Sequence, residues 1–433
     1  MLPPSTDPGL RELASRLRRG ELNLLDQLEE IRERIDAREP EIHALSPEPG
    51  RFERLRRQAE ALAERHPQRR GRPPLFGVLV GVKEIFHVDG LPTTAGSRLP
   101  PGELAGPEAA SVAALRRAGA LVLGKTVSTE FAYLAPGPTR NPHNPEHTPG
   151  GSSSGSAAAV AAGFCPLALG SQTIGSISRP ASFCGVVGFK PSYDRISRRG
   201  VVPLSPSLDH VGTLTADVAG AQLAAAILCD GWRPIKPQRG KPALGIPDGP
   251  YLERASPAAL EGFGATCERL VEAGYRIERL PAMAEFEAIE RRHRTLLAVE
   301  AAAVHRSWYE RHRDLYHPKT RELIEQGAGI SADEEAAARA GREELRQELL
   351  LQMRGGGVDL WISPAARGPA PSGLDSTGDP VMNLPWSQSG LPTLAIPAGA
   401  VRGLPLGLQV AAEWLRDEEL LAWGVDLERA VRR

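Results

Sequence analysis

Apolar residues recur at helical spacing through the first 70 positions of the chain. One apolar stripe runs from position 10 to 17 and ends before Gly20, and a second runs from 24 to 35. A stripe of this kind against a polar remainder is typical of an amphipathic helix packed on a core. Residues 54–66 repeat the pattern with more charge, which predicts a third helix at the surface. The first two stripes consist of Leu10, Leu13, Leu17, Leu24, Leu28, Ile31 and Ile35.

From Gly77 the pattern changes to an unbroken apolar run that ends at Lys83. A run without polar alternation predicts a strand buried on both faces. Similar runs predict strands along the rest of the chain, with helices at 107–117 and 417–431. Because buried strands occur near both ends of the sequence, one sheet shared by the whole chain is favoured over two domains. The other strands are expected at 120–123, 167–169, 242–247, 275–280, 358–364, 391–396 and 406–410.

A helical stretch rich in Ala, Glu, Arg and Leu lies between about Lys241 and Gln352. We expect it to line one side of a substrate cleft, with Trp308, Tyr309 and Tyr316 as candidates for substrate contact or for packing. Four histidines in this stretch lack the i,i+4 spacing of a metal pair, so we expect single solvated histidines and no metal. These are His293, His305, His312 and His317. The predicted layout of the single domain is 1–70 N-terminal helices, 75–220 core, 241–352 helical insertion and 358–433 C-terminal strands and helix.

Two loops rich in glycine and serine flank an apolar segment in the centre of the chain. The segment, 157–170, is too short to cross a bilayer, and Pro166 divides it into a helical half and a short strand. Gly-Gly-Ser-Ser-Ser precedes it at 150–154, and Gly-Ser-Gln-Thr-Ile-Gly-Ser ends at 176. Because apolar structure abuts both loops, they differ from a flexible linker, and their backbone N–H groups are free to bind an oxyanion. We interpret this stretch as an active site.

These loops resemble the amidase signature family. The resemblance extends to GVLVGVKEIF at 77–86, Arg179-Pro180-Ala181, Gly188-Phe189-Lys190-Pro191-Ser192 and the segments 383–386 and 390–392. It implies an α/β fold: a single large domain whose mixed, mostly parallel β-sheet is flanked by helices on both sides. It also implies amide hydrolysis without a cofactor.

The resemblance implies a catalytic triad as well. Ser176 takes the position of the nucleophile, Ser152 that of a bridging serine with a cis peptide bond, and Lys83 that of the base. In isolation, a lysine at a strand end is more often solvated. If Lys83 is buried, however, desolvation disfavours its ammonium form and leaves a neutral amine that accepts a proton.

The same family pattern suggests the groups that surround the substrate. The amides of Thr173, Ile174 and Gly175 and of the nucleophile itself are expected to form the oxyanion hole, with Ser153 beside them. Arg179 either binds a substrate carboxylate in a bidentate fork or holds a carbonyl or carboxylate of the protein, and we favour the second role.

Three residues depart from the usual family pattern. Ile174 adds a bulky side chain beside the oxyanion hole, where a glycine is usual, which affects the shape of the pocket. Gln172 replaces a common aspartate and removes a charge near the loop. Arg179 stands three residues after the nucleophile, where many relatives have it at two.

Composition narrows the class of partners. The net charge is −1 with 24% charged residues, so no global field favours nucleic acid. Four widely separated cysteines indicate reduced core residues rather than disulfides or a zinc site. The N-terminus has no secretory pattern, and we expect a cytoplasmic protein without membrane segments. The expected partner is a small-molecule amide substrate, and a homodimer is compatible with the sequence.

Three other motifs are weaker. Gly119–Thr126 matches the phosphate-loop pattern, but its four central residues are the predicted strand and a helix precedes them. Asp209 and His210 are adjacent, so they point apart and cannot form a Ser–His–Asp relay by themselves. His143 and His147 alternate with prolines, which favours hydrogen-bonded loop histidines over metal ligands.

The predicted function is hydrolysis of the C–N bond of small or aryl amides through a serine acyl-enzyme, with esters and carbamates as further substrates. The alternative is the glutamine-hydrolysing subunit of a tRNA-dependent amidotransferase, which shares the signature. A nucleotide-binding protein acting through Gly119–Thr126 is a distant third.

Overall fold

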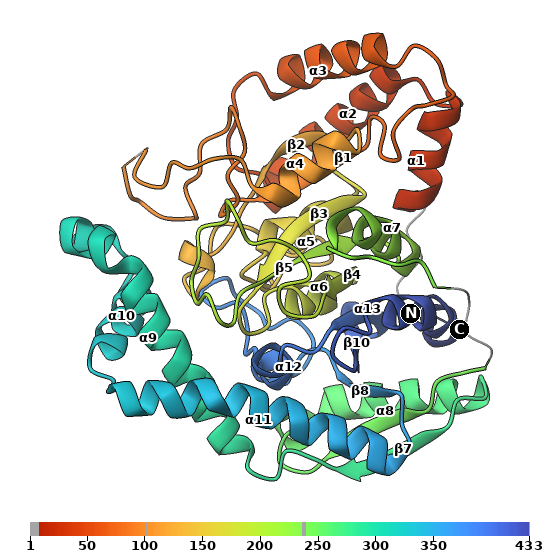
Figure 1. Ribbon diagram of the computed structural model, residues 1–433. Helices are drawn as coiled ribbons and strands as arrows, with labels where there is room; N and C mark the ends of the chain where they lie inside the picture. Colours follow the sequence, from red (N-terminus) through yellow and green to blue (C-terminus); the bar gives the residue numbers. More distant parts are fainter. Residues whose placement is uncertain (1–7, 101, 236–239, 433) are drawn as a thin grey trace.

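The computed structural model describes residues 8–100, 102–235 and 240–432. Ten strands in these ranges form one mixed sheet (Figure 1). The strands are β1 Leu79–Lys83, β2 Leu121–Thr126, β3 Leu167–Gln172, β4 Val187–Lys190, β5 His210–Thr215, β6 Leu244–Asp248, β7 Ile277–Pro281, β8 Leu360–Pro364, β9 Thr393–Val401 and β10 Leu404–Ala412. Their order in the sheet is β2-β1-β3-β5-β4-β9-β10-β8-β6-β7.

Parallel pairing is confined to the two ends of the sheet. β1 pairs in parallel with both β2 and β3, and β6 pairs in parallel with both β8 and β7. The strands between these groups are antiparallel, including the β9–β10 hairpin. Strands from both ends of the sequence thus share one sheet, and the predicted single α/β domain is confirmed.

Helices enclose the sheet. α5 and α6 pack together against the central strands, as do α7 and α13 (Figure 1). The longer helices are α1 Leu10–Arg19, α2 Leu24–Ile42, α3 Arg51–Arg65, α4 Ala110–Arg117, α5 Ser154–Ala161, α6 Ser178–Cys184, α7 Val218–Leu228, α8 Pro257–Glu272, α9 Phe286–His312, α10 Pro318–Ala328, α11 Ala332–Gly356, α12 Leu384–Ser389 and α13 Asp417–Val431. The 3₁₀ turns are η1 Glu130–Ala132, η2 Leu252–Arg254, η3 Arg313–Leu315 and η4 Val381–Asn383.

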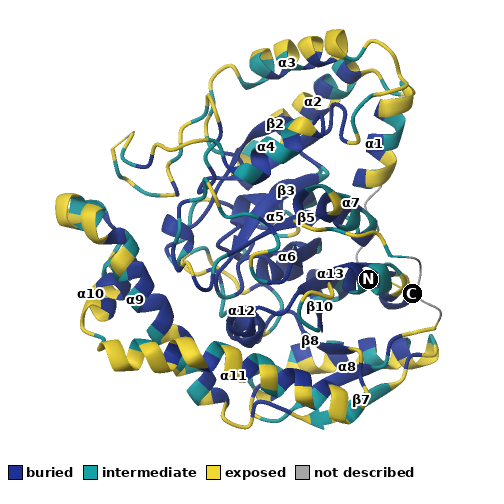
Figure 2. Ribbon diagram, in the orientation of Figure 1, coloured by how far each residue is buried: buried dark blue, intermediate teal, exposed yellow. Residues whose placement is uncertain are grey.

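Burial follows the hydrophobic pattern of the sequence. All residues of β1 to β5 are buried, whereas the outward faces of α3 and α11 are exposed (Figure 2). α1 ends at Arg19, and the left-handed backbone of the next residue, Gly20 (φ 67°), lets its N–H reach the Leu17 carbonyl. None of the described helices is long and apolar enough to cross a membrane.

The prediction of solvated histidines in the helical insertion is wrong for two of the four. His293 and His305 lie on the buried face of α9, which packs on α10 and α11, and both have 0% exposure rather than being solvated. The charged residues around them in the sequence lie on the outer face of the same helix, so the sequence pattern did not indicate that these two histidines are buried. Burial lowers the pKa of each imidazole to about 3. Trp308 stacks on Phe131 at a centroid distance of 6.5 Å, which is a packing role.

Candidate active site

Lys83 ends β1 in the interior of the protein, with 0% exposure. Its Nζ lies 2.7 Å from Ser152 Oγ and 2.8 Å from Ser171 Oγ. Ser171 is a partner that the sequence analysis missed. It lies on β3, which pairs in parallel with β1 so that Val82 faces Leu169, and both strands therefore end at the same edge of the sheet.

Burial sets the protonation state of this lysine. Desolvation lowers the pKa of Lys83 well below its ordinary value, against the opposing effect of Asp209 and Glu84. Neither of its two hydrogen-bond partners is charged, and a serine hydroxyl can donate to a neutral amine as well as accept from an ammonium. The site therefore has a buried amine suited to accept a proton from Ser152.

The two serine-rich loops meet directly. The Gly151–Ser152 peptide bond is cis. Ser153 donates its backbone N–H to the Ser176 carbonyl at 3.3 Å, and its hydroxyl bonds to the backbone of Ser171. Ser176 Oγ has no hydrogen-bond partner among the described residues, and Ser176 is 6% exposed. Catalytic hydrogen bonds are often incomplete without substrate, so this geometry is compatible with a nucleophile that engages Ser152 once substrate is bound.

Gln172 and Asp209 support the loop that carries Thr173, Ile174 and Gly175. The side-chain carbonyl of Gln172 accepts the N–H groups of Ile177 and Ser178 at 2.8 and 2.9 Å. Thr173 Oγ1 donates to Asp209 Oδ1 at 2.6 Å. Burial raises the pKa of Asp209 to about 6 despite this bond. The loop is therefore held from behind by side-chain hydrogen bonds.

Position 175 requires glycine because the Asn383 side chain lies close to its backbone. A Cβ at this position would lie 2.4 Å from Oδ1 of Asn383, a residue with 0% exposure. Asn383 is itself fixed, because its Nδ2 donates to the Ala365 carbonyl and to Gln409 Oε1, both at 2.8 Å. A larger residue at 175 therefore requires the Asn383 side chain to shift.

Arg179 is buried (1% exposed) and binds the protein. Its Nη2 donates to the Gly151 carbonyl at 2.6 Å and to Thr377 Oγ1 at 3.1 Å, and its Nη1 donates to the Gly378 carbonyl. Burial lowers its pKa to about 10, so it stays charged at neutral pH. Because both terminal nitrogens already donate to the protein, Arg179 is not available to bind a substrate carboxylate through two parallel hydrogen bonds.

A narrow cavity of about 10 Å³ opens beside Ser176. Such a volume has room for roughly one water molecule. Apart from Ser176, Thr173 and Arg179, its described lining is hydrophobic or aromatic, formed by Ala132, Tyr133, Leu134, Ile174, Leu204 and Pro380. None of these residues comes from the helical insertion. Instead, Tyr133, Ile174 and Leu204 pack on an apolar cluster that includes residues of α9, α10 and α11.

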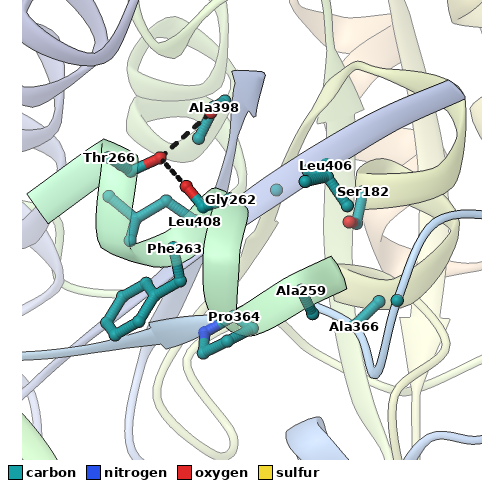
Figure 3. A pocket seen from close by; sticks show the side chains of 12 residues that line it. Ser182, Ala259, Gly262, Phe263, Thr266, Pro364, Ala366, Ala398, Leu406 and Leu408 are labelled. Carbon is teal, nitrogen blue, oxygen red and sulfur yellow. Dashed lines mark hydrogen bonds between the residues drawn. The ribbon is translucent and has the colours of Figure 1, made fainter. Parts of the chain in front are cut away.

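Another cavity of about 10 Å³ lies between α6, α8 and β10, away from this site (Figure 3). The single hydroxyl proton of Thr266 is shared between the carbonyls of Gly262 and Ala398, which lie 2.8 and 3.1 Å from Oγ1 (Figure 3). Its described lining has no titratable side chain, and we regard it as a packing void.

The weaker motifs have structural roles. Gly124, Lys125 and Thr126 belong to β2 and pair with β1, so they do not form a phosphate loop. Lys125 Nζ donates to the Phe86 carbonyl. Asp209 bonds to Thr173, whereas His210 Nδ1 lies 2.7 Å from the Leu208 carbonyl.

The loop histidines are likewise hydrogen-bonded to backbone carbonyls. His143 Nε2 lies 2.9 Å from the Cys184 carbonyl, and His147 Nδ1 lies 2.7 Å from that of Ala370. Within the described ranges, no three His, Cys, Asp or Glu side chains are grouped so as to hold a metal ion.

Comparisons with known proteins agree with the sequence motifs. A family model described as Amidase matches residues 26–421. The A subunit of glutamyl-tRNA(Gln) amidotransferase from Thermus thermophilus is 34% identical over 469 positions, which cover 98% of this chain and 97% of that protein.

Solved structures show the same fold. A crystal structure of an amidase superposes with a TM-score of 0.89 at 35% identity and covers 98% of this chain and 100% of that one. The native peptide amidase of Stenotrophomonas maltophilia superposes with a TM-score of 0.83 at 26% identity, covering 99% and 98%. The chain therefore belongs to the amidase signature family and is a hydrolase of carbon–nitrogen bonds.

Proposed function

We propose that this protein hydrolyses small amides with an uncharged acyl group, through an acyl-enzyme on Ser176. The observation that carries the proposal is the Lys83 amine, which is fully buried, has a lowered pKa and lies 2.7 Å from Ser152 Oγ. A buried, neutral amine in contact with a hydroxyl is the arrangement required of a general base.

In the proposed mechanism, Lys83 accepts the proton of Ser152 while Ser152 accepts that of Ser176. Ser176 Oγ attacks the amide carbon, and the N–H groups of the loop from Thr173 to Ser176 stabilise the oxyanion. The protons return through Ser152 to the nitrogen of the leaving amine as the C–N bond breaks. Water then attacks the acyl-enzyme by the same relay, which releases the carboxylic acid and restores Ser176.

The lining of the cavity supports the choice of acyl group. Ile174, Leu204 and Pro380 present apolar surface beside Ser176, and the cavity is narrow. Arg179, the charged residue among the described lining, has both terminal nitrogens bound to the protein. We therefore place small alkyl and aryl amides first, with the matching esters and carbamates as secondary substrates.

A second candidate is the glutamine-hydrolysing subunit of a tRNA-dependent amidotransferase, which the 34% identity to such a protein supports. Free glutamine carries a carboxylate and an ammonium group, and each needs a charged or strongly polar partner when buried. Among the described residues that line the cavity beside Ser176 there is no carboxylate to bind the ammonium group, and the terminal nitrogens of Arg179 already donate to the protein, so we rank this function second.

Turnover by wild type, Ser176→Ala and Lys83→Ala tests the proposal. The substrates are acetamide, benzamide, anilides, p-nitrophenyl esters, aryl carbamates and glutamine. We expect wild type to hydrolyse neutral amides faster than glutamine, Ser176→Ala to be inactive, and Lys83→Ala to have a kcat about 10²- to 10⁴-fold lower. Glutamine as the preferred substrate would support the second candidate, and activity that survives Ser176→Ala would contradict the mechanism.

A further inference from the structure

Gln172 ends β3 with 0% exposure and has hydrogen bonds on both sides of its amide. Its Oε1 accepts two backbone N–H groups, those of Ile177 and Ser178, which flank the nucleophile on its C-terminal side. Its Nε2 lies 3.0 Å from the hydroxyl of Ser387 on α12. A carbonyl oxygen alone can accept from backbone amides, so the orientation of this side chain is fixed by its partners.

The direction of the next hydrogen bond follows. Because Gln172 Nε2 donates to Ser387 Oγ, the single proton of Ser387 is left for another acceptor. That acceptor is the carbonyl of Ile174, 2.6 Å away. A continuous chain of hydrogen bonds therefore runs from Gln172 through Ser387 to the backbone of the loop 173–176, which we call the oxyanion loop.

Holding this carbonyl also sets the direction of the next N–H group. In a trans peptide the C=O of Ile174 and the N–H of Gly175 lie in one plane and point in opposite directions. Ser387 holds the carbonyl toward α12, and neither Ser387 nor Gln172 lines the cavity beside Ser176. The N–H of Gly175 is therefore directed away from α12.

We propose that Gln172 is a positioning residue that acts through Ser387 to aim the Gly175 N–H at the substrate oxyanion. The inference rests on the proposed function, since it assigns a donor to that reaction. It also explains a neutral amide at this position: a carboxylate can accept the same two N–H groups but cannot donate to Ser387. A carboxylate at 172 takes the Ser387 proton away from Ile174 and adds negative charge near the developing oxyanion.

The test compares Gln172→Glu, Ser387→Ala and the double variant with wild type. Thr266→Ala is the matched control, because Thr266 is also a buried hydroxyl that donates to backbone carbonyls, but it lies on α8 beside the packing void (Figure 3). We expect Gln172→Glu to lower kcat about 100-fold with KM changed less than about threefold, as for loss of one oxyanion donor. The double variant should be no worse than Gln172→Glu, since one chain of bonds is broken in both.

A second readout does not depend on turnover. Phenylboronic acid forms a tetrahedral adduct on the nucleophilic serine, so its affinity reports on the oxyanion donors. We expect its dissociation constant to rise with the fall in kcat, while the affinity for benzoate, a planar product, stays within about threefold. Thr266→Ala should change neither.

The possible failures are distinguishable. Equal losses of boronate and benzoate affinity, additive effects of the two substitutions, or effects no larger than those of Thr266→Ala would each overturn the positioning role. Wild-type protein that is inactive on every substrate but binds phenylboronic acid through Ser176 would contradict the proposed function. The Gln172→Glu binding comparison would still decide this inference.

Discussion

Replacing Lys83 by Met separates the catalytic role of this residue from its effect on stability. Methionine has a similar length and no charge, and it fits an apolar interior. The substitution removes the proton acceptor and its bonds to Ser152 and Ser171. We expect kcat to fall about 10²- to 10⁴-fold, the usual contribution of a general base. Lys83→Arg should be equally inactive, because a guanidinium stays charged at neutral pH.

The effect on stability depends on pH in a defined direction. The pKa of Lys83 is lowered in the folded protein by burial, so between the folded value and the ordinary value of 10.5 the unfolded chain binds more protons. Stability of the wild type therefore rises with pH through this window, by about 1.4 kcal/mol per pH unit for one proton. From pH 7.5 to 9.5 the wild type should therefore gain stability relative to Lys83→Met, by at most about 2.7 kcal/mol, which is the value for one proton over two pH units.

Denaturant unfolding of both proteins at the two pH values measures this gain. Other buried groups, including Lys125 and Lys190, are common to both proteins, so their titration cancels in the difference. A difference in unfolding free energy that is the same at pH 7.5 and 9.5 would mean that Lys83 is charged in the folded state. That result would refute Lys83 as the base, whatever the loss of activity.

Other changes near the oxyanion loop have distinct expected outcomes. Ser176→Ala should abolish turnover yet change the unfolding free energy by less than about 1 kcal/mol, because its hydroxyl makes no hydrogen bond to the described residues. Gly175→Ala should destabilise by about 1–3 kcal/mol in denaturant unfolding, since its Cβ would lie 2.4 Å from Asn383 Oδ1; unchanged stability would contradict this packing. Ile174→Gly should raise kcat/KM for benzamide relative to acetamide about tenfold by widening the cavity, and an unchanged ratio would place the acyl group elsewhere. Arg179→Met should reduce turnover of neutral and anionic amides alike, because the guanidinium holds protein carbonyls; a loss confined to anionic amides would show that it binds substrate.

Local sequence signals predicted eight of the ten strands in the described ranges and the position of Lys83, but not β4 and β5. Val78 to Val82 are consecutive buried residues, and such a run has few other interpretations. The end of β3 was harder to predict: the strand was expected to end at 169, but it continues to Gln172. Ser171 and Gln172 are polar but still pair with β5, so the hydrophobic pattern stops before the strand does.

The supporting contacts of the site were not predictable from local sequence. Gln172 and Ser387 are 215 residues apart, and Arg179 reaches Gly378 across 199. No spacing rule connects such positions, because the sheet and its loops bring them together only after folding. A similar limit explains His293: the helix has charged residues on one face, and the identity of its buried face depends on how α9 packs.

Three buried lysines show why a lowered pKa does not by itself identify a base. Burial lowers the pKa of Lys125 to about 8 and that of Lys190 to about 7, and that of Lys83 is also well below its ordinary value. Lys125 donates to the Phe86 carbonyl and Lys190 to that of Leu391, and a carbonyl has no proton to give. Lys83 instead contacts two serine hydroxyls, which carry protons. The chemistry of its partners, more than the size of the shift, is what makes Lys83 the candidate base.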